Sequence, residues 1–88
     1  MANHKSALKE HRQSVKRRLR HRTHRSRMRT AVKNLRGAME AGDAEAARGL
    51  LPATLALVDR TAKLGAIHDS AAARTKSRLT RAINKLAG

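Results

Sequence analysis

Most of the side chains in this 88-residue sequence that could take part in chemistry are cationic. Arginine occurs 14 times and lysine seven times, against six aspartates and glutamates, so the formal net charge is +15. The planar guanidinium group of arginine can hold two phosphate oxygens at once through its N–H donors. The composition therefore favours binding to a polyanion whose charge neutralises that of the chain.

The spacing of these bases indicates how they would meet such a partner. They recur at intervals of three and four residues, which places them along one side of a helix, and nearby hydroxyls could add neutral donors. One stripe consists of Arg18, Arg22, Arg25, Arg29, Lys33 and Arg36, and a second of Arg74, Arg78, Arg81 and Lys85. Between residues 5 and 29, bases also point in every direction around the helix. That pattern is typical of a helix enclosed by phosphates, as in a folded RNA.

Other kinds of chemistry find little support. The sequence has no Cys or Tyr, few acids and no Gly-rich phosphate loop, so we exclude an enzyme and expect no cofactor. His21 and His24, with His11 as a third candidate, could be considered as a metal site, but the surrounding arginines repel cations and no carboxylate or thiolate completes the set. The absence of aromatic residues argues against a protein that stacks single-stranded bases on aromatic rings.

Three helices must position these residues. Gly42 followed by Asp43 predicts the end of one helix and the N-cap of the next, and Gly65 predicts a second stop before an N-cap at Asp69 or Ser70. No apolar pattern of period two suggests strands. The predicted helices span about residues 5–41, 43–64 and 69–86.

Each predicted helix carries an apolar seam, so the sequence predicts a single all-α domain over residues 1–88, an antiparallel three-helix bundle. Gly49 and Pro52 predict a break or kink near residues 49–52 of the middle helix. The seams are Met28, Val32, Leu35 and Met39 in the first helix, Leu51, Leu55, Val58 and Ala62 in the second, and Ala72, Leu79, Ile83 and Leu86 in the third.

The first helix is too long for this bundle. At about 1.5 Å per residue it would extend about 55 Å, well beyond its partners. Leu8, Val15 and Leu19 also lie almost opposite its seam. The first 15–20 residues are therefore expected to overhang the bundle, either bound to another molecule or disordered.

The charge is concentrated in the first and last segments. Residues 1–42 carry 13 bases and two acids, residues 43–64 three of each, and residues 65–88 five bases and one acid. The net charges are therefore +11, zero and +4. We expect the first and third helices to contact the RNA and the neutral middle helix to face solvent.

Several motifs together resemble the bacterial small-subunit (30S) ribosomal proteins of the S-twenty family. The most specific of them reads Ala-Ala-Arg-Thr-Lys-Ser-Arg-Leu at residues 72–79 and follows Ile-His at 67–68. The others lie at residues 6–9, 12–14, 16–20, 28–30, 40–43 and 58–60. Because these motifs extend over nearly the whole chain without an evident insertion, the sequence is identified as a member of that family.

The resemblance implies a three-helix bundle with a long first helix that binds 16S rRNA directly and helps it to fold, without performing chemistry. It also implies a cytoplasmic location in the small subunit, with few or no protein contacts and no membrane or small-molecule partner. His68 is expected either to cap a helix or to contact a phosphate. The resemblance and the two stripes together predict rRNA contacts by Lys5, Lys9, Arg12, Lys16, Arg17, Arg18, Arg20, Arg22, Arg25, Arg29, Lys33, Arg36, His68, Arg74, Lys76, Ser77, Arg78 and Arg81.

One alternative function remains open. A helical DNA-binding or nucleoid-associated protein would have a similar charge, although a bZIP-like basic region would need leucine heptads, and here the helix is predicted to end near Gly42. A membrane-surface helix is disfavoured because its apolar face would hold only Leu8, Val15 and Leu19.

Overall fold

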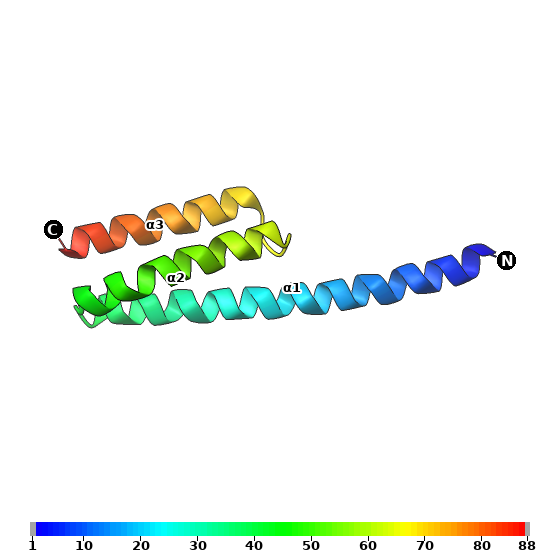
Figure 1. Cartoon of the computed structure of the whole chain (residues 1–88), viewed down its shortest axis with the longest axis horizontal. Helices are drawn as coiled ribbons and strands as arrows, with labels where there is room; N and C mark the ends of the chain where they lie inside the picture. Colours follow the sequence, from blue (N-terminus) through cyan, green and yellow to red (C-terminus); the bar gives the residue numbers. More distant parts are fainter. Residues whose placement is uncertain (1, 88) are drawn as a thin grey trace.

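The computed structural model describes the backbone of residues 2–87 and the side chains of residues 5–86, and it contains three α-helices. They are α1 (Ala2–Glu40), α2 (Ala44–Lys63) and α3 (Asp69–Ala87). Consecutive helices run in opposite directions, so that α1 and α3 point the same way (Figure 1). Within residues 2–87 there is no strand, and the predicted all-α three-helix fold is confirmed.

The turn between α1 and α2 forms as the sequence predicts. Gly42 adopts a φ of +74°, a conformation that L side chains rarely take, and its N–H donates to the Met39 carbonyl at 3.0 Å. The Asp43 N–H donates to the Ala38 carbonyl at 3.1 Å. Asp43 then caps α2, because its Oδ1 accepts the Ala46 N–H at 3.1 Å.

The second turn also uses a glycine, but its N-cap differs from the prediction. Gly65 has a φ of +78°, and its N–H donates to the Ala62 carbonyl at 2.9 Å. The capping acceptor of α3 is Nδ1 of His68, which receives the Ser70 N–H at 3.1 Å. Asp69 and Ser70 lie inside the helix, so their assignment as N-cap is wrong by one or two residues. The imidazole nitrogen replaces the usual side-chain oxygen because it reaches the same orphan amide.

The core forms where the three helices meet. Leu35, Ala47, Leu79 and Ile83 pack into one buried cluster, which joins α1, α2 and α3. Val32, Ala38, Met39 and Leu51 pack against it. The predicted seams of α1 and α3 are thus largely confirmed, whereas Leu86 in the last turn of α3 is exposed.

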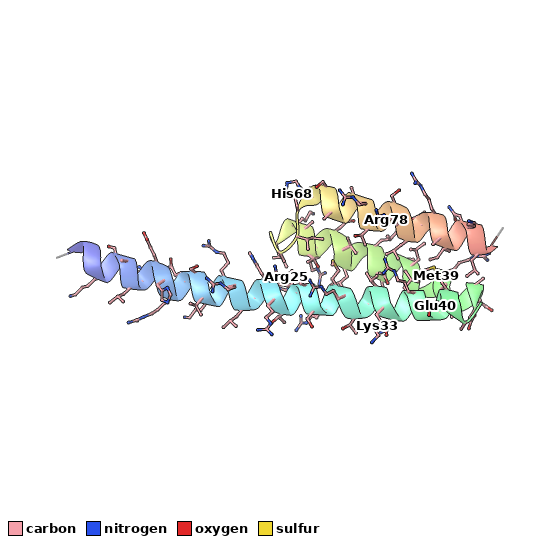
Figure 2. The ribbon with its side chains drawn as sticks, turned by 180° about the vertical axis from the view of Figure 1, so that it is seen from behind. Arg25, Lys33, Met39, Glu40, His68 and Arg78 are labelled. Atoms are coloured by element: carbon pink, nitrogen blue, oxygen red, sulfur yellow. The ribbon has the colours of Figure 1, made fainter. Side chains whose placement is uncertain are left out.

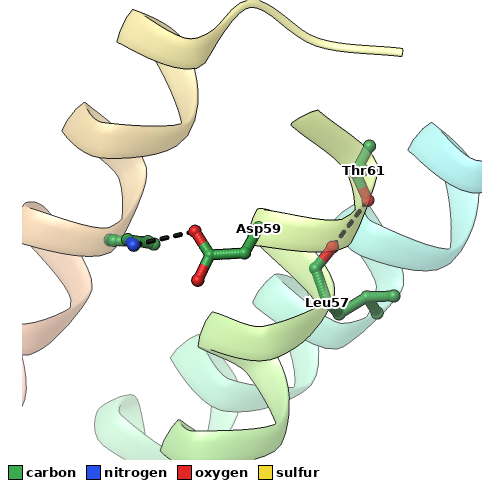
Figure 3. A network of polar contacts seen from close by, with 4 residues as sticks. Leu57, Asp59 and Thr61 are labelled. Carbon is green, nitrogen blue, oxygen red and sulfur yellow. Dashed lines mark hydrogen bonds and ion pairs between the residues drawn. The ribbon is translucent and has the colours of Figure 1, made fainter. Parts of the chain in front are cut away.

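Helix α2 lies between the other two helices (Figure 1). It is therefore less exposed to solvent than its zero net charge suggested. It buries Thr54 and Thr61 as well as Val58, because a helix with a partner on each side needs a wider buried face than one seam. The Thr61 hydroxyl donates to the Leu57 carbonyl at 2.7 Å, which satisfies the buried oxygen (Figure 3). The expectation that the middle helix faces solvent therefore holds only for the part of α2 that neither α1 nor α3 covers.

The helix α2 continues through Gly49 and Pro52 without interruption. Pro52 has no N–H to donate to the Arg48 carbonyl, which is why a break was expected there. Ala47 and Thr54 are buried on either side of Pro52, and Pro52 itself is exposed. Packing on both sides of the proline holds the helix together, so the chain does not break at residues 49–52.

Helix α1 extends far beyond the bundle, as predicted. The longest dimension of the molecule is 66 Å, and every side chain from Lys5 to Arg20 is exposed. Leu8, Val15 and Leu19 in this overhang are all exposed. From Lys5 onward, the first half-buried side chain is that of His21, so the overhang ends there.

Candidate nucleic-acid interface

The predicted contact residues lie on the surface of α1 and α3, apart from His68, which directly precedes α3. Sixteen of the eighteen are exposed, and the exceptions, Arg25 and Lys76, are half-buried. Within the part of the chain that the structure describes, one ion pair forms, between Lys76 and Asp59. The positive charge along α1 is thus uncompensated by the acids of the chain itself and is available to an external anion.

The stripe on α1 borders a shallow hollow of about 470 Å³. Four basic side chains line it together with two hydroxyls: Arg22, Arg25, Ser26, Arg29, Thr30 and Lys33. The hydroxyls are not equivalent, because that of Thr30 donates to the Ser26 carbonyl at 3.0 Å. The Thr23 hydroxyl likewise donates to the Leu19 carbonyl at 3.0 Å. In these positions Thr23 and Thr30 cannot also donate to a phosphate, so the phosphate donors of this hollow are its basic side chains and the Ser26 hydroxyl.

Two histidines of α1, His21 and His24, lie near the turn between α2 and α3. His21 and His24 are half-buried and share a hollow of about 310 Å³ with Arg17, Arg20 and Leu64. The His21 ring lies 3.9 Å from the point that a Cβ on Gly65 would occupy. Among the residues that the structure describes, no group of three His, Cys, Asp or Glu side chains could hold a metal ion. His21 and His24 thus lie at the point where α1 extends beyond the bundle.

The stripe on α3 faces away from the core. Leu79 and Ile83 are buried, whereas Arg74, Arg78 and Arg81 are exposed. The structure therefore does not merge this stripe with the one on α1, since α2 lies between the two helices (Figures 1 and 2). The two stripes offer separate surfaces to a partner.

His68 combines the two roles considered for it. Its Nδ1 accepts the Ser70 N–H, so this nitrogen carries no hydrogen in the observed arrangement. The ring hydrogen then lies on Nε2, and the side chain is exposed at the start of α3 (Figure 2). The capping role is observed, and Nε2 is left as a donor.

Lys76 differs from the other predicted contact residues because it already forms an ion pair with an acid of the same chain. Its Nζ lies 2.8 Å from Oδ1 of Asp59 on α2. No local pattern in the sequence points to Asp59 as the partner of Lys76, since 17 residues separate the two. The pairing leaves Arg74, Ser77, Arg78 and Arg81 as the stronger candidates on α3.

No helix within residues 2–87 combines the length and apolarity that crossing a bilayer requires.

Comparison with known proteins supplies an independent line of evidence. Residues 2–84 match the family model described as ribosomal protein S20. The small ribosomal subunit protein bS20 of Maridesulfovibrio salexigens is 51% identical over 87 residues, which cover 99% of this chain and all of that protein. The bS20 proteins of Nitratidesulfovibrio vulgaris and Geobacter metallireducens are 46% and 45% identical, over 99% and 98% of this chain and 100% and 99% of theirs.

Proposed function

Because this chain belongs to the family of ribosomal protein S20, we propose that it binds 16S rRNA directly, through the basic side chains of α1 and α3. It is a structural protein of the small ribosomal subunit, in the cytoplasm, and not an enzyme. Binding neutralises rRNA phosphates and thereby stabilises the folded RNA.

One observation carries this proposal: the overhang of α1 is strongly basic and has no partner within the bundle. Every side chain from Lys5 to Arg20 is exposed, and a single helical segment with so many like charges is marginal on its own. A phosphate-rich partner would remove the repulsion and supply the missing contacts. The contact residues proposed here are Lys5, Lys9, Arg12, Lys16, Arg17, Arg18 and Arg20, followed by Arg22, Arg25, Arg29, Lys33 and Arg36 in the bundle.

A second contact is proposed for α3. Arg74, Ser77, Arg78 and Arg81 are exposed on its outer side, and His68 presents Nε2 at its start. Since α2 lies between α1 and α3, the two surfaces are expected to meet different segments of rRNA. Lys76 belongs to this contact only as a weak member, because Asp59 already compensates its charge.

The charge distribution also bears on protein neighbours. The three bases and three acids of residues 43–64 leave the α2 segment neutral, and both other helices pack against it. We therefore expect rRNA to be the main partner and contacts with other ribosomal proteins to be few.

Competition binding tests the proposal against the DNA-binding alternative. Labelled 16S rRNA in complex with the chain is challenged with unlabelled folded 16S rRNA or with duplex DNA of equal phosphate content, at physiological salt. Folded rRNA should compete about 10³-fold better, the lower end of the usual ratio of specific to non-specific binding. The same rRNA unfolded by removal of Mg²⁺ is the matched control. Equal competition by DNA would reject the proposal.

A further inference from the structure

A groove between α1 and α3 differs in character from the basic stripes. It encloses about 570 Å³, and its walls come from one side of α1 and from Thr75 of α3. Its α1 side extends from Met28 to Glu40, which corresponds to about 18 Å along the helix axis. The core cluster lies behind one side of this groove, because Val32, a lining residue, packs against that cluster.

The floor of the groove is apolar. Met28 and Val32 are half-buried, and each lines the groove with the part of its side chain that the core does not cover. Gly37 adds no side chain to the α1 wall, and a Cβ built there would meet no atom within 4 Å, so the space beside it is open. A fully hydrated phosphate gains nothing from such a floor, so the occupant must bring apolar surface of its own.

The lip of the groove is basic. Arg29, Lys33 and Arg36 line it, all from α1. Glu40 lines the far end and is the single acid of the lining. The occupant should therefore combine an apolar body with negative charge, and its charge should lie toward Arg29 and Lys33, away from Glu40.

An unpaired nucleotide of the bound RNA has this combination. We propose that the groove receives one such nucleotide, with its base against Met28 and Val32 and its phosphate at Arg29 and Lys33. The base would lie against the Met28 thioether and the Val32 methyl groups. These would take the place of the aromatic rings that this sequence lacks. The inference rests on the proposed rRNA-binding function and adds a specific subsite to it.

Tethered hydroxyl-radical cleavage locates the occupant. The chain contains no cysteine, so Gly37→Cys and Thr75→Cys each give one attachment point for an iron chelate, on opposite walls of the groove. Gly37→Cys enters open space and should not disturb the fold. Both variants, bound to 16S rRNA, should cleave around the same unpaired nucleotide. Ala56→Cys, exposed on α2 and outside the groove, is the control and should give a different pattern.

An abasic substitution tests the contact with the base. Removing the base at the located nucleotide, while keeping its phosphate, should weaken binding of the unaltered protein about five- to tenfold through lost apolar contact. Met28→Ala should cause a similar loss with intact RNA and little further loss with abasic RNA. Met39→Ala is the matched control: Met39, labelled in Figure 2, is also a half-buried methionine of α1, but it is not among the residues that line the groove. Its effect should be the same with both RNAs.

The outcomes separate this inference from the proposed function. If both tethers cleave only base-paired RNA, or if intact and abasic RNA bind equally well, the groove does not hold a nucleotide. The preference for folded 16S rRNA over duplex DNA would remain in that case. Cross-linking of the same tether positions to another ribosomal protein in assembled subunits would also overturn the inference and assign the groove to a protein segment. Loss of the preference for rRNA would instead reject the proposed function.

Discussion

Lys76 Nζ and Asp59 Oδ1 form an ion pair of 2.8 Å that joins α3 to α2 (Figure 3). Both side chains remain partly exposed, 37% for Lys76 and 54% for Asp59, so the pair contributes only about 0–1 kcal/mol to the free energy of unfolding. Its larger consequence is for binding. One of the bases that the sequence assigns to rRNA is already compensated inside the chain.

The first prediction compares this residue with a neighbour on the same helix. Lys76→Ala should weaken 16S rRNA binding less than Arg78→Ala, because the Arg78 charge has no partner among the described residues. Equilibrium binding at fixed salt measures both losses. Asp59→Ala serves as the control: it releases Lys76 and removes a negative charge, so rRNA binding should tighten slightly. A larger loss for Lys76→Ala than for Arg78→Ala would mean that rRNA displaces Asp59.

The second prediction concerns the core. Leu35 has no exposed surface and joins the cluster shared by all three helices, so Leu35→Ala should lower the free energy of unfolding by about 2–5 kcal/mol. Leu19→Ala makes the same change on the same helix at a side chain that is 57% exposed, and should change stability by less than about 0.5 kcal/mol. Urea denaturation followed by circular dichroism checks both values. Similar values for the two variants would contradict the observed packing.

The third prediction separates the two roles of His68. His68→Ala removes the acceptor for the Ser70 N–H and should destabilise the protein by about 0.5–2 kcal/mol, the usual cost of losing an N-cap. His68→Asn keeps a capping oxygen but removes the imidazole, so its stability should stay close to that of the unaltered protein. If Nε2 contacts a phosphate, both variants should bind rRNA more weakly at equal folded fraction. Full affinity in His68→Asn would show that the residue serves only as a cap.

The fourth prediction concerns the overhang of α1. In the free protein the amides of residues 5–18 should exchange hydrogen rapidly, because no tertiary contact supports this part of the helix and its like charges repel. Addition of 16S rRNA should slow their exchange strongly. The amide of Leu35 serves as an internal reference and should be protected in both states. Strong protection of residues 5–18 without rRNA at low ionic strength would contradict this account.

The fifth prediction distinguishes a phosphate contact from a general effect of charge. The logarithm of the binding constant should fall with the logarithm of salt concentration by about 0.7–0.9 per phosphate contact, and Arg18→Ala should reduce that slope by about one. Arg48→Ala removes the same charge from the exposed surface of neutral α2 and should leave the slope nearly unchanged. Titrations at several salt concentrations measure both slopes. Equal changes in slope would mean that net charge alone governs binding.

Local patterns in the sequence predict much of this molecule. Gly42 and Asp43 mark a helix end and an N-cap because glycine tolerates a positive φ and a short carboxylate reaches an orphan amide. Leu35 and Leu79 are recognised as core residues by their place in a seam of helical period. The overhang follows from helix length and from the position of Leu19 opposite the seam. Each of these inferences needs only residues within a few helical turns of one another.

The sequence by itself therefore determined the three helices, their turns, the exposed basic stripes and the overhang. Only the tertiary structure decided that α2 lies between its neighbours and buries Thr61, that Asp59 compensates Lys76, and that Met28 and Thr75 border one groove. The physical reason is that helical periodicity orders side chains around a single axis. Which face of another helix they meet depends on how helices distant in sequence pack, and no repeat within one helix encodes that packing.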